Sequence, residues 1–446
     1  MTDPDTIVAP ATPPGVGGLA VVRLSGPRSG EIIRALDSRH HSPEHRQAVL
    51  IRLKDISGQI FDDAVATFFQ APHSYTGEDL VEISCHGNPL VVQHLVEDCC
   101  RRGARVAHPG EFTQRAFIHG KMDLIQAEAV ASFIEAQSLE SARLNHRILQ
   151  GELSSHFQEL KTRLLSLLQS VEYILDITEE EPEAGFFPNL LKNTATLAHA
   201  GKALLATYRR GHLLTEGATI VLSGPPNSGK STLLNRLSNS DRAITSPNPG
   251  TTRDYIDVRF NLNGIPIKLV DTAGLRESTD LVEEAGISHT RRLMENADIL
   301  VWVQSVETEP VEAPTEPRKP DLLLFNKSDL PGTHEALKDQ QTDALLVSAL
   351  RGDGIEEFKA ELLKKLGGAT LLSSGIALTT ARQHAALTSF LAPLQRSLAL
   401  LDSPEPPLEI ISFEFREALQ SLDVLLGKTT PDDIINAIFG TFCVGK

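Results

Sequence analysis

The chain has 446 residues, 41% of them hydrophobic and 22% charged, which indicates a globular protein of roughly two to four domains. Its formal net charge of −16 argues against a general nucleic-acid coat protein, because phosphate binding needs concentrated lysine and arginine. No apolar run approaches the roughly 18 to 20 residues that span a bilayer, and the first residues lack the basic and apolar regions of a secretory signal. The four cysteines show no metal-ligand spacing and favour a reducing cytoplasm.

Residues 1 to about 118 mix short strand-like runs with one apolar helix-like stretch. The strand-like runs are LAVVRLSG (19–26), AVATFFQ (64–70) and LVEISCHG (80–87), and the helix-like stretch is PLVVQHLVEDCCRRG (89–103). This texture predicts a small α+β domain.

From about residue 123 the strand signals give way to helical periodicity. Six apolar residues recur at steps of three and four and mark one face of a long helix: Phe157, Leu160, Leu164, Leu167, Val171 and Ile174. We expect the acidic, proline-containing segment 178–189 to end this helix and a further helical stretch to run to about residue 213. After residue 368 the chain is helix-like again.

The region 215–368 has a different texture. Strand-like runs alternate with helix-like ones, at 218–224, 267–274, 297–305, 321–329 and 343–350, which predicts βαβ units and a parallel sheet. The proline- and glutamate-rich segment 307–320 is expected to be a surface loop. We therefore predict an α+β domain (1–118), a helical domain in two parts (119–214 and 369–446), and an α/β domain (215–368) inserted between those parts.

The strand-like run 218–224 leads directly into GPPNSGKST (224–232), the pattern G-x-x-x-x-G-K-[ST] between a strand and a helix. Its glycines allow backbone N–H groups to surround phosphates, Lys230 supplies a cation, and Ser231 can hold Mg²⁺. The alternative is an ordinary glycine-rich turn, which the flanking strand and helix disfavour. The motif predicts a nucleotide-binding domain.

Two switch-type motifs follow in the expected order. Thr252 in GTTRD (250–254) can offer a second Mg²⁺ ligand, and Asp271 in DTAG (271–274) can hold the water shell of the metal. The backbone N–H of Gly274 can meet the γ-phosphate. Loops tied to that phosphate are natural switches, ordered before hydrolysis and released after it.

The motif NKSD (326–329) predicts specificity for guanine. Asp329 can accept two hydrogen bonds from the base, from groups that adenine does not offer, while Asn326 would brace the loop. The segment SAL (348–350) would cover the base. Together with the phosphate motif, these residues predict a GTP-binding protein.

Leu275 occupies the place where small Ras-like GTPases carry a water-orienting glutamine, so another group must orient the attacking water. No arginine finger is evident, and Arg253 and Arg276 are more simply explained as solvated switch-loop residues. Asn227, inside the phosphate loop, could help to bind a monovalent cation. Such a cation would neutralise transition-state charge as an arginine finger does.

With these residues in place, the whole chain resembles the MnmE (TrmE) family of bacterial tRNA-modifying GTPases. The resemblance rests on the motifs above and on DTIVAPATPPGVGGLAVVRLSG (5–26), APHSYTGEDLVEISCHG (71–87), HPGEFTQRAFIHGKMDLIQAEAV (108–130), DTAGLRES (271–278) and the closing FCVGK (442–446). It implies a multidomain α/β protein: an N-terminal α+β folate-binding and dimerising domain, then a helical domain interrupted by an inserted Ras-like P-loop G domain.

The resemblance also implies an activity. GTP hydrolysis would be coupled to addition of an aminomethyl or carboxymethylaminomethyl group at C5 of the wobble uridine of certain tRNAs. The implied assembly is a cytoplasmic homodimer that works with the flavoprotein MnmG, in a heterotetramer or similar, and not on a membrane. The implied cofactors are Mg²⁺, K⁺ and a reduced folate, 5,10-methylene- or 5-formyl-tetrahydrofolate, with K⁺ stimulating hydrolysis when the G domains of two protomers meet.

Roles carry over position by position. Glu283 would orient the attacking water, with Lys230, Thr252 and Gly274 as the other catalytic residues. The residues implied to bind K⁺ are Asn227, Ser246, Asn248 and Thr251, in a loop that Pro247 and Pro249 stiffen. The residues expected to bind GTP are Asn227, Ser228, Gly229, Lys230, Ser231, Thr232, Ser246, Pro247, Asn248, Pro249, Gly250, Thr251, Thr252, Asp271, Thr272, Ala273, Gly274, Asn326, Lys327, Asp329, Ser348, Ala349 and Leu350.

For the folate, the matching positions are Arg23, Glu82, Lys121 and Lys446, and Cys443 lies near the one-carbon chemistry without an assigned role. Glu82 can pair with the donor edge of a pterin, and the cations can meet its glutamate tail. Prenylation of Cys443 is disfavoured, because Gly445 is not aliphatic and Lys446 is not a usual last residue. We expect the tail to return to the folate pocket, within one chain or across the dimer.

Two other classes remain to be tested. A ribosome-assembly or regulatory GTPase such as Era or Der would share the G domain, but should lack the N-terminal blocks and the FCVGK ending. A P-loop ATPase or kinase conflicts with NKSD.

Overall fold

The computed structural model describes residues 5–41, 44–176, 183, 185–240, 257–271, 291–308, 311, 313, 315–330, 344–368, 375–429 and 432–445. The chain divides into two compact units. The first comprises Met1–Ala131, Leu149–Lys161 and Arg416–Lys446, and the second Ser132–Ile148 and Thr162–Phe415. Among the described residues, no helix is long and apolar enough to cross a membrane.

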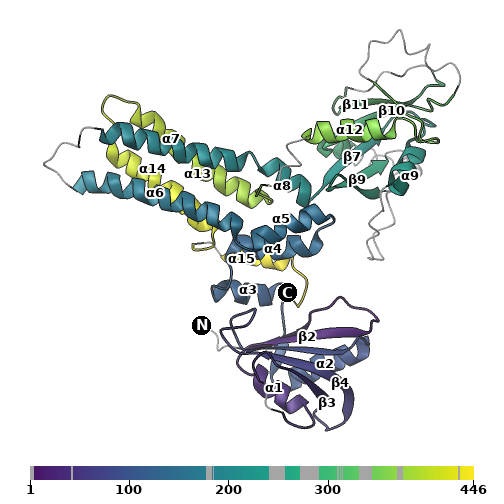
Figure 1. Ribbon diagram of the computed structural model, residues 1–446, viewed down its shortest axis with the longest axis vertical. Coiled ribbons are helices and arrows are strands. Elements are labelled where there is room, and N and C mark those ends of the chain that lie inside the picture. Colours follow the sequence, from purple (N-terminus) through teal and green to yellow (C-terminus); the bar gives the residue numbers. More distant parts are fainter. Residues whose placement is uncertain are drawn as a thin grey trace. The chain divides into compact units, whose positions relative to one another are not determined.

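The first unit contains a six-stranded sheet with the order β3-β4-β5-β2-β1-β6. Figure 1 labels its strands β2, β3 and β4. Its neighbouring strands are antiparallel, except that β1 and β6 run parallel. The strands are β1 (Thr6–Pro10), β2 (Leu19–Ser25), β3 (Ala48–Lys54), β4 (Ile60–Phe69), β5 (Leu80–His86) and β6 (Ala104–Val106). The predicted runs at 19–26, 64–70 and 80–87 thus correspond to β2, β4 and β5.

Helices α1 (Ser29–Leu36) and α2 (Pro89–Arg101) cover one face of this sheet. The helix α2 begins after Asn88, whose side chain accepts a hydrogen bond from the N–H of Leu90. The apolar faces of both helices pack on alternate strand residues such as Val22 and Ile83. Side chains alternate between the two faces along a strand. Arg23 and Glu82, the chain neighbours of Val22 and Ile83, therefore project from the opposite face of the sheet.

The helical region begins within the first unit and continues in the second. Its helices are α3 (Glu111–Ile118), α4 (Leu124–Glu135), α5 (Leu139–Leu149), α6 (Glu152–Asp176), α7 (Phe186–Leu205), α8 (Tyr208–Thr215), α13 (Ala381–Leu401), α14 (Leu408–Leu425) and α15 (Asp432–Gly440). The long helix predicted from its apolar face is α6, in which Phe157, Leu164 and Val171 are fully buried. The non-helical segment expected at 178–189 is too long, because α7 already begins at Phe186. Pro188 is tolerated in the first turn of α7, where its missing N–H costs no hydrogen bond within the helix.

The predicted parallel sheet of the inserted region is present in the second unit, with the order β12-β11-β10-β7-β9-β8 (Figure 1). All neighbours are parallel except β8 and β9. Its elements are β7 (Ala218–Ser223), α9 (Lys230–Ser240), β8 (Asp257–Leu262), β9 (Ile265–Asp271), β10 (Ile299–Ser305), β11 (Leu322–Asn326), β12 (Leu345–Leu346) and α12 (Ile355–Leu366). We had not predicted β8, although the turn Asn263–Gly264, with φ of 50° and 92°, is a hairpin signal.

Candidate nucleotide and folate sites

The nucleotide motifs meet at one edge of the parallel sheet. Strands β7, β9 and β11 end there, and each is followed by a predicted binding segment. Asp271, the last residue of β9, lies opposite Leu222 of β7, just before the phosphate loop. Ligands bind outside the carboxyl ends of parallel strands because loops from several strands converge there.

The phosphate loop needs its glycines because other chain segments approach it closely. A Cβ on Gly224 would lie 2.0 Å from the carbonyl oxygen of Val303, and one on Gly229 would lie 2.2 Å from Nδ2 of Asn326. Between them, Asn227 has a φ of 60°, a left-handed conformation that asparagine tolerates better than most residues. The loop is therefore held in one shape by both its own sequence and its neighbours.

Lys230 lies inside this loop. Its Nζ donates to the carbonyl oxygens of Gly224 and Pro225, over 3.1 and 2.8 Å, and to Oγ of Ser228 over 3.3 Å. The side chain is buried, so its charge faces the loop interior and not bulk water. This is the position from which a lysine can contact phosphate oxygens.

Ser231 and Asp271 place two oxygen donors side by side. The hydroxyl of Ser231 donates to Oδ2 of Asp271 over 2.9 Å, and Asp271 is 3% exposed. A hydroxyl and a carboxylate are the hard oxygen ligands that Mg²⁺ prefers. The residues therefore fit a magnesium site in which Ser231 is a direct ligand and Asp271 holds a coordinated water.

The guanine motif is built into the same edge. Asn326, 1% exposed, donates from Nδ2 to the carbonyl of Ser228 over 3.0 Å and accepts at Oδ1 from the N–H of Ala349 over 3.0 Å. Asp329 accepts at Oδ1 from the hydroxyl of Ser348 over 2.6 Å. That hydrogen bond holds the pKa of Asp329 below its ordinary value, so the carboxylate is charged at neutral pH.

A second polar site lies on the face of the first sheet that α1 and α2 leave open. Arg23 on β2 and Glu82 on β5 are cross-strand partners, and Nη2 of Arg23 donates to Oε1 of Glu82 over 2.7 Å. The guanidinium lies over the rings of Tyr75 and Phe112, 5.4 and 5.7 Å from their centroids. Among the described residues Oε2 of Glu82 has no hydrogen-bonding partner, which leaves it able to accept from a ligand.

The end of the chain closes over this site. Val444 forms a β-bridge with Pro109, and the carbonyl oxygen of Gly445 accepts from Nη1 of Arg23 over 3.4 Å. Gly445 has a φ of 100°, and a Cβ there would lie 2.0 Å from the carbonyl oxygen of Pro10. The tail thus returns to the N-terminal sheet within a single chain, with Cys443 exposed beside it.

Lys121 forms a hydrogen bond with the loop that carries Tyr75. Its Nζ donates to the carbonyl oxygen of Pro72 over 2.8 Å, while Tyr75 lies further along the same loop, against Arg23. The structure therefore brings Arg23 into direct contact with both Glu82 and the tail, and it places Lys121 against the loop that carries Tyr75. Aromatic rings, a carboxylate oxygen that no described residue contacts, and cations are suited to a flat heterocycle with an anionic tail.

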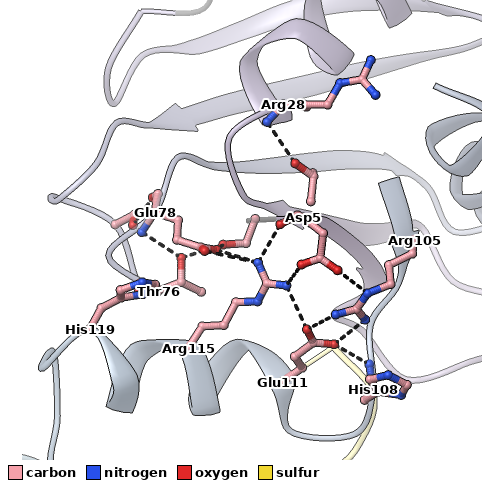
Figure 2. Close-up of polar contacts among 12 residues, drawn as sticks. Asp5, Arg28, Thr76, Glu78, Arg105, His108, Glu111, Arg115 and His119 are labelled. Atoms are coloured by element: carbon pink, nitrogen blue, oxygen red, sulfur yellow. Dashed lines mark hydrogen bonds and ion pairs between the residues drawn. The ribbon is translucent and has the colours of Figure 1, made fainter. Parts of the chain in front are cut away.

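A network of charged residues, which we had not singled out in the sequence, supports this site (Figure 2). Nη2 of Arg115 donates to Asp5 over 2.6 Å and to Glu111 over 2.9 Å, and Nη1 donates to Glu78 over 3.0 Å. Arg105 holds both oxygens of Glu111 over 2.6 and 2.8 Å. The network fixes the start of α3, directly after the residues that contact the tail.

Comparisons with known proteins agree along the whole chain. The family model "GTP-binding protein TrmE N-terminus" matches residues 6–121, and "MnmE helical domain" matches residues 124–443. The tRNA modification GTPase MnmE of Nitrosomonas europaea is 40% identical, and the match covers 100% of both chains. The chain belongs to the MnmE family. The MnmE proteins of Koribacter versatilis, at 38% identity over 99% of both chains, and of Aquifex aeolicus, at 36% over 99% of this chain and 100% of the relative, are similar to it along the same length.

Membership in the MnmE family confirms the predicted family, the multidomain α/β fold class and the enzyme class, a GTP hydrolase. Among solved structures, the G domain of the T. maritima FeoB iron transporter matches 33% of this chain and 98% of its own, at 21% identity. The TM-score of that match is 0.23.

Several MnmE-type site residues lie outside the residues that the structure describes, and their roles stay predictions. They comprise the potassium loop, the second Mg²⁺ ligand, the water-orienting glutamate and the terminal lysine. These residues are Ser246, Pro247, Asn248, Pro249, Gly250, Thr251, Thr252, Thr272, Ala273, Gly274, Glu283 and Lys446.

Proposed function

We propose that this chain hydrolyses GTP in the inserted domain 215–368 and uses that cycle to modify tRNA. The modification is addition of an aminomethyl or carboxymethylaminomethyl group at C5 of the wobble uridine, carried out with the flavoprotein MnmG. One observation carries the proposal: the match to tRNA modification GTPases extends over the whole chain, including the N-terminal and helical regions on either side of the G domain.

On the nucleotide side, Lys230 binds the phosphates and Asp329 binds the guanine edge. Mg²⁺ is held by Ser231 and Thr252, and when bound it neutralises charge that develops on the phosphates. The proximity of Ser231 to Asp271 supports this assignment. Glu283 orients the attacking water, the role that a glutamine has in small Ras-like GTPases at the position of Leu275.

On the folate side, Glu82 accepts hydrogen bonds from the pterin, and Arg23 holds Glu82 in position. Lys121 and Lys446 meet the anionic tail of a reduced folate, which supplies the one-carbon unit. Within the described part of the chain Oε2 of Glu82 accepts no hydrogen bond, and this open acceptor supports the role, as does the contact of Gly445 with Arg23.

The assembly that follows is a cytoplasmic homodimer joined through the N-terminal domain, with MnmG and tRNA as partners. K⁺, held by Asn227 and the loop 246–251, stimulates hydrolysis when the G domains of two protomers meet. The functional division is into the segments 1–118, 119–214, 215–368 and 369–446.

Nucleoside mass spectrometry of tRNA from cells that lack this protein tests the proposal. We expect wobble uridine without the C5 group, restored by the parent chain but not by Lys230→Ala, which removes the phosphate contact, or by Glu82→Gln, which removes the folate acceptor. Unchanged tRNA in the deletion strain would reject the modification function. Defective ribosome assembly with normal tRNA would favour the assembly-GTPase class.

A further inference from the structure

We propose that Glu307 is a positioning residue for the guanine nucleotide, acting through Lys327 of the NKSD motif. Glu307 opens the proline- and glutamate-rich segment 307–320, to which the sequence assigns no function. The inference rests on the proposed role of Asp329 in guanine binding. It makes the beginning of this segment part of the nucleotide site.

The contact itself is short and polar. Nζ of Lys327 lies 2.5 Å from Oε2 of Glu307, with the two side chains 33% and 49% exposed. The hydrogen bond from Lys327 keeps the pKa of Glu307 below its ordinary value, so the carboxylate is charged at neutral pH. Lys327 has a φ of 67°, a left-handed backbone conformation that is uncommon for lysine. The ammonium group is therefore held, on a backbone that has this uncommon conformation.

Glu307 is held in turn by the end of the parallel sheet. The N–H of Val306 donates to the carbonyl oxygen of Asn326 over 3.1 Å, and the N–H of Glu307 donates to Oγ of Ser305 over 3.2 Å. Asn326 immediately precedes Lys327, so the two partners are fixed to the same strand end.

The segment folds back beyond Glu307 as well. Gln304, 7% exposed on β10, donates from Nε2 to the carbonyl of Val311 over 2.6 Å and accepts at Oε1 from the N–H of Val311 over 3.0 Å. A buried side-chain amide that satisfies both backbone groups of one residue fixes that residue in place. Val311 is thus fixed to Gln304, three residues before Glu307.

Anchoring the ammonium has a direct consequence for binding. A lysine side chain has four rotatable bonds, and ordering it when a ligand binds costs conformational entropy. With its end held by Glu307, the methylene stem of Lys327 is ordered before the ligand binds and can form an apolar wall for the base. This raises nucleotide affinity but leaves the chemical step unchanged.

The test compares Glu307→Gln with Glu316→Gln in the full-length protein. Glu316 lies in the same segment, is 84% exposed and pairs with Arg291 at 3.6 Å, so the control makes the same charge change away from NKSD. Removing a negative charge strengthens the general attraction of an anionic nucleotide in both variants. For Glu307→Gln the proposal predicts weaker nucleotide binding instead. The rate constant of GDP release and the KM for GTP should rise about two- to fivefold, the range expected for loss of an exposed ion pair, while kcat stays unchanged.

Two further measurements test whether the loss of the ion pair with Lys327 causes the weaker binding. In a Lys327→Met background, Glu307→Gln should no longer weaken binding, because the partner is gone. High salt should bring the single variant and the parent together. Unchanged or tighter GDP binding by Glu307→Gln, or an undiminished effect in the Lys327→Met background, would overturn the proposal. Asp329→Asn tests the underlying site separately: if it binds GTP as tightly as the parent, the guanine assignment itself is wrong.

Discussion

The side-chain amide of Asn326 donates to the backbone carbonyl of Ser228 over 3.0 Å, and so joins the guanine motif directly to the phosphate loop. The same side chain accepts from the N–H of Ala349. One buried residue thus ties together three loops that are separated in sequence. The base and phosphate subsites are consequently parts of one rigid element.

Replacing Asn326 with alanine should loosen both subsites. The buried partners at Ser228 and Ala349 would lose their hydrogen bonds, which costs about 1–3 kcal/mol in unfolding free energy. We expect GDP affinity, measured with a fluorescent analogue, to fall about tenfold or more. The control is Asn235→Ala, an exposed residue on α9. Equal GDP affinity in the two variants would show that the bridge does not organise the site.

Asn227 should decide whether hydrolysis distinguishes K⁺ from Na⁺. The parent is expected to hydrolyse GTP faster in K⁺ at matched ionic strength. Asn227→Gly keeps the left-handed backbone at φ of 60° but removes the side-chain oxygen, so the K⁺ to Na⁺ rate ratio should fall towards one. GDP affinity, measured in parallel, should change little. Equal rates in the two salts for the parent would remove the potassium assignment.

Gly445→Ala should separate folate binding from GTP binding. A Cβ at this position would meet the carbonyl of Pro10 at 2.0 Å in a left-handed backbone, so the tail cannot stay against Arg23. We expect affinity for a reduced folate to fall about tenfold, as it should on deletion of Lys446, with GTP affinity intact.

The matched control for Gly445→Ala is Gly440→Ala, because a Cβ on Gly440 would meet nothing within 4 Å. Isothermal titration with tetrahydrofolate and with GDP gives both readouts on the same samples. A tail that is only packing would leave folate affinity unchanged in both variants.

The stability of the first unit should depend on pH through Asp5 and Glu111 (Figure 2). Burial raises both pKa values, but hydrogen bonds from Arg105 and Arg115 outweigh it and leave them below the ordinary 3.8 and 4.5. A lowered folded-state pKa stabilises the fold above the unfolded value, and this contribution is lost as pH falls through the folded value. The protection of backbone amides in β1 and α3 against hydrogen exchange should therefore be high at neutral pH and decline below about pH 4.5.

Hydrogen exchange, corrected for the intrinsic effect of pH, measures this decline. Arg115→Met should lower protection already at pH 7 and flatten the pH dependence, because three carboxylates lose a shared partner. Arg101→Met removes an exposed pair with Glu97, 3.8 Å away, and serves as control. A pH profile of Arg115→Met that matches the parent would exclude this network as the cause.

The nucleotide site could be predicted from the sequence because its parts are local and their order determines where they meet. The phosphate loop is a strand, a glycine-rich turn and a helix in succession, and parallel strands then bring Asp271 and Asn326 to the same edge. The hydrogen bond from Asn326 to Ser228, by contrast, crosses 98 residues and depends on how two loops pack. No local sequence pattern predicts such a contact.

The candidate folate site was even harder to predict from the sequence. Arg23 and Glu82 face each other because β2 and β5 pair in one particular register, across 59 residues of sequence. A register shift by one residue would send Arg23 to the buried face. Only the resemblance to a family suggested these residues, and the partners of Arg115 were not suggested at all.

The contact between Gly445 and Arg23 also sets an order of events during synthesis. The N-terminal sheet can fold while the ribosome is still making the G domain, since domains generally fold as units from the amino end. The contact above that sheet forms only after residues 444 and 445 have been synthesised. A product truncated before Cys443 would keep the whole G domain but lack this contact, so under the proposed function it would hydrolyse GTP without modifying tRNA.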